Sequence, residues 1–325
     1  MTFRMKPIAA LVAAALMAGT TAGAEDFKML TGWGANHSGT ANMAYGYIDI
    51  VKEMSGGEII ITPSGPEVVP AGQQLQPVAA GVFDLIYTHG LYHTGDTGIG
   101  AALDAVKGDV DFRRDSGIWD WVDQHYQDTQ GLKILAIPTA TTGFRFYLHD
   151  PMDPEKKLKG MKIRALPSYN KIVESLGATP VVVQFGELYS AAEKGVIDGM
   201  VWTTVGAVGY KFHEVAPYIA EPAFGTVSYL IMMNLDKWNG LDADTQKLLL
   251  DAGYQIEKDS VEIFERLREE EDAQMFAEGA QTTSIGMTAE EANRLFTERA
   301  LEVAVEMSGK TGEEFRDLVL STSGM

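Results

Sequence analysis

Apolar and polar stretches between residues 158 and 202 alternate in a way that predicts three strands and two helices. Short apolar runs are typical of strands, and they occur at residues 161–165, 181–183 and 196–201. Apolar residues recur at helical spacing over residues 170–176 and 188–194, and a glycine follows each segment as a helix C-cap. The continuous run at 181–183 is of the kind that a parallel sheet buries on both faces. The segment is therefore predicted to form a βαβαβ unit.

The strand ends of this unit carry side chains suited to binding. Arg164 ends the first strand, the turn at Gln184-Phe185 follows the second, and Trp202 follows the third. Because open α/β sheets bind ligands at the carboxyl ends of their strands, these side chains are predicted to lie together. On position alone, Arg164 is either a ligand-binding residue or a surface arginine in an ion pair.

A similar unit is predicted nearer the N-terminus. Strand patterns occur at residues 27–32, 58–62 and 83–88, and helical patterns lie between them at 39–54 and 73–80. Residues 91–131 are mainly helical in pattern. Each half of the molecule is therefore expected to have its own sheet.

The remaining pattern predicts connections between the halves. Strands at residues 133–139 and 143–148 make the first crossing, and the apolar run at 227–234 makes the return. Residues 242–279 have few helix breakers and predict one long helix, which could kink at Gly253. Helical segments at 287–307 and 312–320 are expected to close the second half.

The first 24 residues have the pattern of a secretory signal peptide. Arg4 and Lys6 precede an apolar run over residues 8–18, and small residues end the segment. That run is shorter than the roughly 20 residues needed to span a bilayer. We expect cleavage near residue 25 and export to the periplasm, with no direct membrane insertion.

Charge and composition limit the partners. After removal of the leader, 24 basic residues face 45 acidic ones, a formal charge of −21. This acidic balance argues against nucleic acid and anionic lipid as partners. The chain has no cysteine, so its stability depends on an apolar core rather than on disulfides, and its length favours two lobes.

Four short motifs in one order resemble a known family. They are L-K-G-x-K-I-R at 158–164, S-L-G-A-x-P at 175–180, F-G-E-L-Y at 185–189 and G-V-I-D-G at 195–199. The combination is similar to the solute-binding proteins of tripartite ATP-independent periplasmic (TRAP) transporters, dicarboxylate-receptor type.

The resemblance implies a bilobal, periplasmic-binding-protein-like α/β fold of the type II kind, with crossing strands and a long shared helix. Lobe I is expected to comprise residues 25–141 and 230–270, and lobe II residues 142–229 and 271–325. It also implies a periplasmic receptor that holds an organic carboxylate between the lobes and delivers it to a TRAP membrane permease. Such a receptor uses no cofactor and is not an enzyme.

Two arginines are the expected anion contacts. The family's K-I-R arginine holds the solute carboxylate, and Arg164 matches it; a guanidinium offers two parallel charge-assisted hydrogen bonds. Arg145 lies near the position of a second basic residue in the family, although one residue closer to Arg164 than expected. For Arg145, ligand contact and a structural ion pair at the hinge both stay open.

Trp202 marks a departure from the family. Many members carry an acidic or polar residue where Val201 stands and an amide where Trp202 stands. The change argues against a sialic-acid-like or dicarboxylate solute and against metal-assisted binding of an oxo acid. It favours an aromatic or less polar carboxylate packed on the indole, against the alternative of a core tryptophan.

Further contacts are expected after the first and third strands. By resemblance, Tyr87, Thr88 and His89 are expected to hydrogen-bond a solute hydroxyl or oxo group, and the same role is expected for the loop residues Trp33, Asn36 and His37. His89 and His93 have the spacing of a metal pair, but Gly90 interrupts a helix there and no third ligand is near in the sequence. We therefore expect no metal site.

No catalytic set stands out in the sequence. A G-x-S-x-G elbow, an H-E-x-x-H pair and a cysteine nucleophile are missing. The alternatives to a TRAP receptor are a binding protein of another uptake or sensing system and, less favoured, an exported α/β enzyme.

Overall fold

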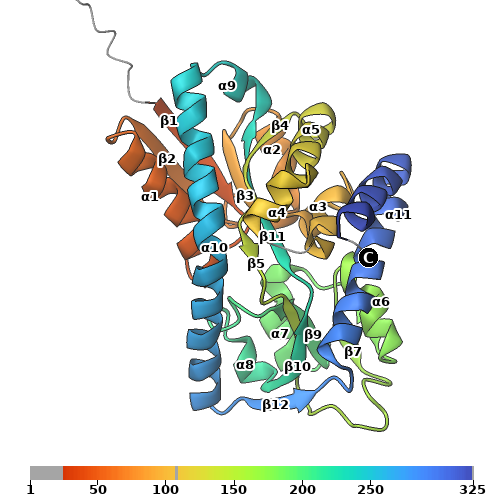
Figure 1. Cartoon of the computed structure of the whole chain (residues 1–325). Coiled ribbons are helices and arrows are strands. Elements are labelled where there is room, and N and C mark those ends of the chain that lie inside the picture. Colours follow the sequence, from red (N-terminus) through yellow and green to blue (C-terminus); the bar gives the residue numbers. More distant parts are fainter. Residues whose placement is uncertain (1–24, 107–108, 324–325) are drawn as a thin grey trace, which may run out of the picture.

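The computed structural model describes residues 25–106 and 109–323, and the predicted signal peptide lies outside the described residues. Within these residues the strands form two six-stranded sheets (Figure 1). The first has the order β2-β1-β3-β11-β4, with β5 also paired to β11. Its strands are β1 (Glu25–Thr31), β2 (Ile59–Ser64), β3 (Leu85–His89), β4 (Leu132–Ala136), β5 (Thr139–Ala140) and β11 (Val227–Asn234).

The second sheet has the order β12-β10-β6-β9-β7-β8. Its strands are β6 (Phe144–Leu148), β7 (Lys162–Arg164), β8 (Thr179–Val181), β9 (Gly199–Thr203), β10 (Tyr218–Phe224) and β12 (Gln281–Ser284). Strand β7 pairs in parallel with β8 and β9, and β1 pairs in parallel with β2 and β3. Both predicted βαβαβ units are therefore confirmed.

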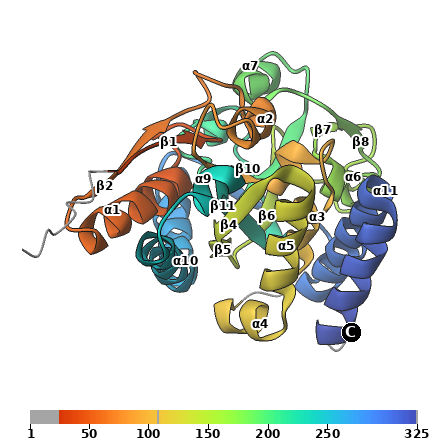
Figure 2. The same cartoon turned by 90° about the horizontal axis from the view of Figure 1, so that it is seen from above.

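Helices cover both sheets, as the view from above shows (Figure 2). Those of the first lobe are α1 (Tyr45–Met54), α2 (Leu75–Ala79), α3 (Ile99–Ala102), α4 (Val110–Asp115), α5 (Ile118–Gln130) and α9 (Leu235–Asn239). Those of the second are α6 (Pro167–Ser175), α7 (Leu188–Glu193) and α8 (Phe212–Val215). There is also a π-helix, η1 (Thr40–Ala44), and the 3-10 helices are η2 (Ala71–Gln73), η3 (Gly90–His93), η4 (Leu103–Ala105) and η5 (Phe185–Glu187).

The lobes are joined as predicted, by crossing strands and a long helix. The chain passes from β5 to β6 and returns from β10 to β11, and all eight residues of β11 are buried. Helix α10 (Ala243–Ala277) runs along both lobes (Figure 1). It is continuous through Gly253, where an added Cβ would lie 2.0 Å from the carbonyl oxygen of Leu135. The glycine therefore permits close packing of α10 against β4.

The predicted burial of one strand is wrong. The apolar run at 181–183 is not buried on both faces, because β8 is the edge strand of its sheet and the side chain of Val182 is 77% exposed. The third strand also begins later than predicted, at Gly199, and Val196 is exposed before it. A run of valines predicts extended structure but does not distinguish a central strand from an edge strand.

The last helix contacts elements of both lobes. Helix α11 (Ala289–Ser323) is interrupted at Gly309, where φ is 54°. It packs on α6 and β10 of the second lobe and on α3 and η4 of the first. Ser308 accepts a hydrogen bond from the Gly98 amide at 2.9 Å, and Phe315 contacts Trp121 with ring centroids 5.2 Å apart. The end of α11 therefore contacts the first lobe, and the assignment of residues 271–325 to lobe II stays a prediction.

Candidate ligand-binding site

Arg164 ends β7 at the junction of the two lobes. Its backbone pairs with Val181 of β8 and with Met200 of β9, which places it inside the sheet. Pro167 then begins α6, so the chain turns away directly after the arginine. The side chain is 1% exposed, and its Nε and Nη1 atoms have no hydrogen-bond partner among the described residues. A buried guanidinium with free donors is costly unless an anion pairs with it.

Arg164 lies in the wall of a small cavity between the lobes. The volume is about 20 Å³, which is close to the room needed for one water molecule, so the walls must move to admit an organic acid. The lining residues come from both lobes: Trp33, His37, His89, Leu91, Tyr92, Phe144, Arg164, Leu166, Tyr169, Trp202, Thr203, Val227 and Tyr229.

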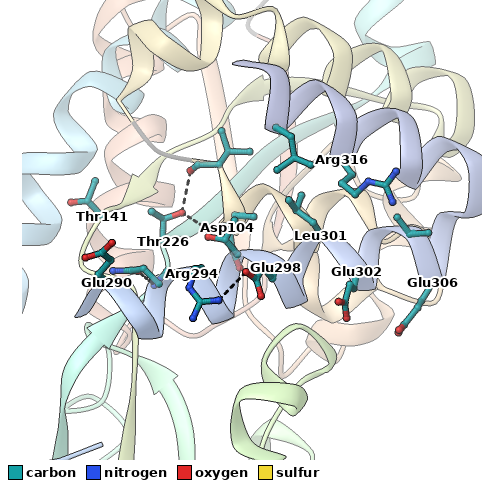
Figure 3. A pocket seen from close by; sticks show the side chains of 17 residues that line it. Asp104, Thr141, Thr226, Glu290, Arg294, Glu298, Leu301, Glu302, Glu306 and Arg316 are labelled. Atoms are coloured by element: carbon teal, nitrogen blue, oxygen red, sulfur yellow. Dashed lines mark hydrogen bonds and ion pairs between the residues drawn. The ribbon is translucent and has the colours of Figure 1, made fainter. Parts of the chain in front are cut away.

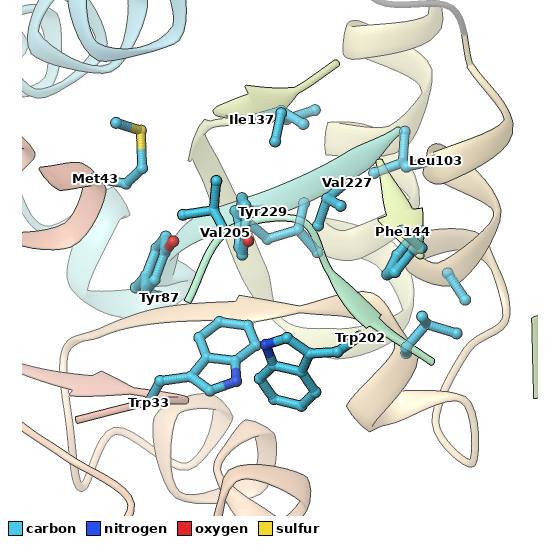
Figure 4. Packing of buried hydrophobic residues seen from close by; sticks show 14 of the residues in the cluster. Trp33, Met43, Tyr87, Leu103, Ile137, Phe144, Trp202, Val205, Val227 and Tyr229 are labelled. Atoms are coloured by element: carbon cyan, nitrogen blue, oxygen red, sulfur yellow. The ribbon is translucent and has the colours of Figure 1, made fainter. Parts of the chain in front are cut away.

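Two indoles form much of the aromatic wall, and Figure 4 shows them next to each other. Trp33 stacks on His37 with ring centroids 5.1 Å apart. Trp202 lies in β9, stacks on Phe185 at 5.6 Å and has the Arg164 Cζ atom 5.7 Å from its ring. Both rings therefore border the cavity, and Phe185 packs on Trp202 without lining the cavity itself.

The residues at the end of β3 take different roles. His89 lines the cavity, and its Nε2 lies 3.1 Å from an oxygen of Asp104. Thr88 does not line it, and its hydroxyl pairs with Nε2 of His93 at 2.9 Å. Tyr87 also lies outside the lining, stacked on Tyr229 at 5.4 Å. The two histidines of the suspected metal spacing thus have separate partners.

Arg145 is engaged by protein groups and does not line the cavity. Its Nε donates to the Tyr147 hydroxyl at 3.0 Å, its Nη1 lies 3.3 Å from a Glu221 oxygen, and its Nη2 pairs with Asp272 of α10. The side chain is fully buried. Of the two alternatives for Arg145, the structural ion pair fits this arrangement, because no donor is directed to the cavity.

Loops of the two lobes meet beside the cavity. The Asn36 side chain donates to the Gly209 carbonyl at 2.9 Å, so this predicted ligand contact instead bridges the lobes. Glu271 of α10 accepts from the Ser38 hydroxyl in the first lobe and from the Gly206 amide, at 2.8 Å, in the second. These contacts join the two lobes beside the cavity.

The sequence analysis missed several aromatic lining residues, notably Tyr92, Tyr169 and Tyr229. Burial raises the pKa values of Tyr92 and Tyr169, and the Arg164 guanidinium offsets part of this rise. Both phenols therefore lie near the guanidinium. A tyrosine within the apolar run 227–234, on a strand predicted to cross between lobes, was the available signal for Tyr229.

His37 predicts a loss of stability in acid. Burial lowers its pKa to about 3, below the ordinary 6.5, while its Nδ1 accepts from the Thr40 amide at 3.1 Å. Below pH 6.5 the unfolded chain therefore binds more protons than the folded protein does. The free energy of unfolding falls as the pH falls, by about 2 kcal/mol at pH 5. Denaturant unfolding at pH 7 and pH 5 measures it.

The matched variant for this test is His37→Asn, which keeps a side-chain acceptor near the Thr40 amide. Its free energy of unfolding should fall less between pH 7 and pH 5 than that of the wild type. Other groups, including the buried Glu257 and Glu271, titrate in both proteins, so the difference isolates His37. Equal losses in the two proteins would show that His37 does not carry the effect.

A larger groove of about 1160 Å³ lies beside α11 (Figure 3). Its charged residues Glu290, Arg294, Glu298 and Glu306 are exposed, and Arg294 pairs with Glu298 at 3.1 Å within it. Unlike the small cavity, it presents no buried arginine with free donors among the described residues. The small cavity is therefore the better candidate for ligand binding, despite its size.

Comparison with known proteins gives a family match over residues 36–307, to the bacterial extracellular solute-binding proteins of family 7. The ectoine-binding periplasmic protein TeaA of Halomonas elongata is 28% identical over 177 residues, or 52% of this chain and 50% of that protein. A monocarboxylate 2-oxoacid-binding periplasmic protein of a Nostoc species is 24% identical over 240 residues, or 70% of this chain and 64% of its own length. The alignments thus span about half to two thirds of these relatives.

A solved structure has the same fold. A TRAP periplasmic solute-binding protein from Desulfovibrio salexigens, with bound orotic acid, has a TM-score of 0.79 and 18% identity, covering 92% of this chain and 98% of that one. Among the helices of the described residues, none is both long and apolar enough to cross a membrane.

Proposed function

This chain belongs to the bacterial extracellular solute-binding proteins of family 7 and is a TRAP solute-binding protein, and from that premise we propose that it captures an organic carboxylate with Arg164 as the clamp. The carboxylate is held in the cavity between the lobes and is an aromatic, hydroxy or oxo acid. The receptor works in the periplasm and delivers the solute to a TRAP membrane permease. It performs no chemistry on the solute.

The buried guanidinium of Arg164 is the observation that carries this proposal. Its Nε and Nη1 atoms have no hydrogen-bond partner among the described residues, so they are available as charge-assisted donors to a carboxylate. Each charge-assisted hydrogen bond contributes about 1.5–3 kcal/mol. Micromolar binding needs about 8 kcal/mol, so closure of the lobes and the aromatic walls must supply the rest.

The ligands named for two related proteins are acids, which supports an acid as the solute of this protein. The Nostoc relative is named for monocarboxylate 2-oxo acids, and the Desulfovibrio structure holds orotic acid. The acidic surface of this chain does not oppose an anionic solute, because salt screens charge over about 8 Å while the cavity wall is cationic.

A thermal-shift screen against carboxylic acids, each beside its neutral amide, tests the proposal. An acid at one hundred times its Kd should add about 2.7 kcal/mol of stability, while the amide should add far less, because it lacks the charge that pairs with Arg164. The proposal fails if no acid raises the melting temperature or if acids and amides raise it equally.

A further inference from the structure

The cavity wall offers hydrogen-bond donors beyond Arg164. The indole N–H groups of Trp33 and Trp202 are buried and have no hydrogen-bond partner among the described residues. Both side chains are 4% exposed. An indole N–H only donates, and buried donors are normally paired. Two such groups in one small cavity therefore indicate an acceptor that comes from outside the chain.

No neighbouring group among the described residues accepts a hydrogen bond from these indole N–H groups. Burial raises the pKa of the Tyr92 phenol, and the nearby Trp33 indole offsets part of this rise. No hydrogen bond of normal geometry forms between the Trp33 N–H and the Tyr92 hydroxyl, however. Trp202 is stacked face to face on Phe185, with an interplanar angle of 14°, so its ring plane is set by packing. The direction of its N–H is thus fixed before a ligand arrives.

The charges of the wall are all of one sign. Among the residues that line the cavity, the ionisable groups are Arg164, two histidines and three tyrosines, and no carboxylate is present. Asp104, which does not line the cavity, contacts His89 and accepts from the Ser228 amide at 2.8 Å. A ligand ammonium would have no counter-ion here, and burying an unpaired charge is costly.

We propose that this site selects flat monoanionic acids that carry one further neutral acceptor, such as a 2-oxo or ring carbonyl oxygen, and that Trp33 and Trp202 receive this acceptor with their indole N–H groups. The acid group lies on Arg164, so the inference rests on the proposed function. Acids with an ammonium in place of the acceptor are excluded. Trp33 and Trp202 are thus specificity-determining residues.

Calorimetric titration with matched acids tests the ligand class. The probes are pyruvate beside propionate and alanine, phenylpyruvate beside 3-phenylpropanoate and phenylalanine, and orotate beside benzoate. In each set the acid with the extra acceptor should bind at least about 10-fold more tightly than its counterpart without it. The amino acids should show no binding. Tighter binding of the amino acids or of the acceptor-free acids in every set overturns the proposal.

The variants Trp33→Phe and Trp202→Phe test the donors, because phenylalanine keeps a flat ring and removes the N–H. Each should weaken the tightest acid by roughly 10- to 100-fold and weaken its acceptor-free counterpart much less. Trp121→Phe is the matched control, since Trp121 stacks on His125 away from the cavity, and it should bind as the wild type does.

The outcomes separate the two proposals. If both cavity variants bind the acids with wild-type affinity while Arg164→Lys does not, the selection by indoles is wrong and the carboxylate clamp stands. If no acid binds the wild type, both proposals fail. If both variants lose the acceptor-bearing and acceptor-free acids equally, the tryptophans act by packing, and the proposed selection is wrong.

Discussion

The Arg164→Met protein is expected to lose all measurable carboxylate binding and yet to unfold at about the wild-type temperature without ligand. Methionine fills much of the volume of the arginine stem but offers no charge and no donor. The Nε and Nη1 atoms of Arg164 make no hydrogen bond within the described residues, so the substitution breaks none of theirs. Losing two charge-assisted hydrogen bonds alone weakens binding by roughly 100-fold or more.

Arg145→Met is the matched control, because both arginines are buried in the second sheet. Its loss removes the buried partner of Asp272 and Glu221, which then keep only Arg268, and breaking a buried pair costs about 3–5 kcal/mol. Scanning calorimetry and titration calorimetry on both variants give the comparison. A large drop in the melting temperature of Arg164→Met, together with retained binding, would show that Arg164 is the structural arginine of the two.

Gly209→Ala is expected to weaken ligand binding by roughly 5- to 150-fold, the range that corresponds to an overpacking cost of about 1–3 kcal/mol. An added Cβ would lie 2.0 Å from the backbone oxygen of Asn36, across the contact between the lobes. The backbone of Gly209 has no positive φ, so alanine is not strained by conformation. The methyl group therefore acts as a wedge that opposes closure, while Arg164 is untouched.

Gly95→Ala controls for this test, since an added Cβ at Gly95 meets no atom within 4 Å. It should bind as the wild type does. Small-angle scattering adds a second readout: ligand should reduce the radius of gyration of the wild type more than that of Gly209→Ala. Wild-type affinity and an equal reduction in Gly209→Ala would show that closure does not bring these two loops together when ligand binds.

The strand and helix pattern predicted most of the fold, because both sheets are built from local βαβ units. The order of motifs around residues 158–199 led to Arg164, and the structure places it at a strand end with free donors. Trp33, His37, His89 and Trp202 were also predicted, and they line the same cavity.

The remaining site residues depend on tertiary contacts that lie far apart in the sequence. Arg145 and Arg164 are both buried arginines on strands, and the acids Asp272 and Glu221, both distant in sequence, make Arg145 the ion-paired one of the two. Asn36 follows the first strand as expected, but its side chain donates a hydrogen bond to the Gly209 carbonyl in the opposing loop. Edge and central strands likewise differ by neighbours that a run of valines does not encode.

A crystal structure with the tightest-binding acid tests the assignment of the site most directly. The carboxylate should lie within about 3 Å of the guanidinium nitrogen atoms of Arg164, between the rings of Trp33 and Trp202. A bound acid whose carboxylate pairs with another cation, or one that lies in the groove beside α11, would contradict the assignment of Arg164 as the clamp of this receptor.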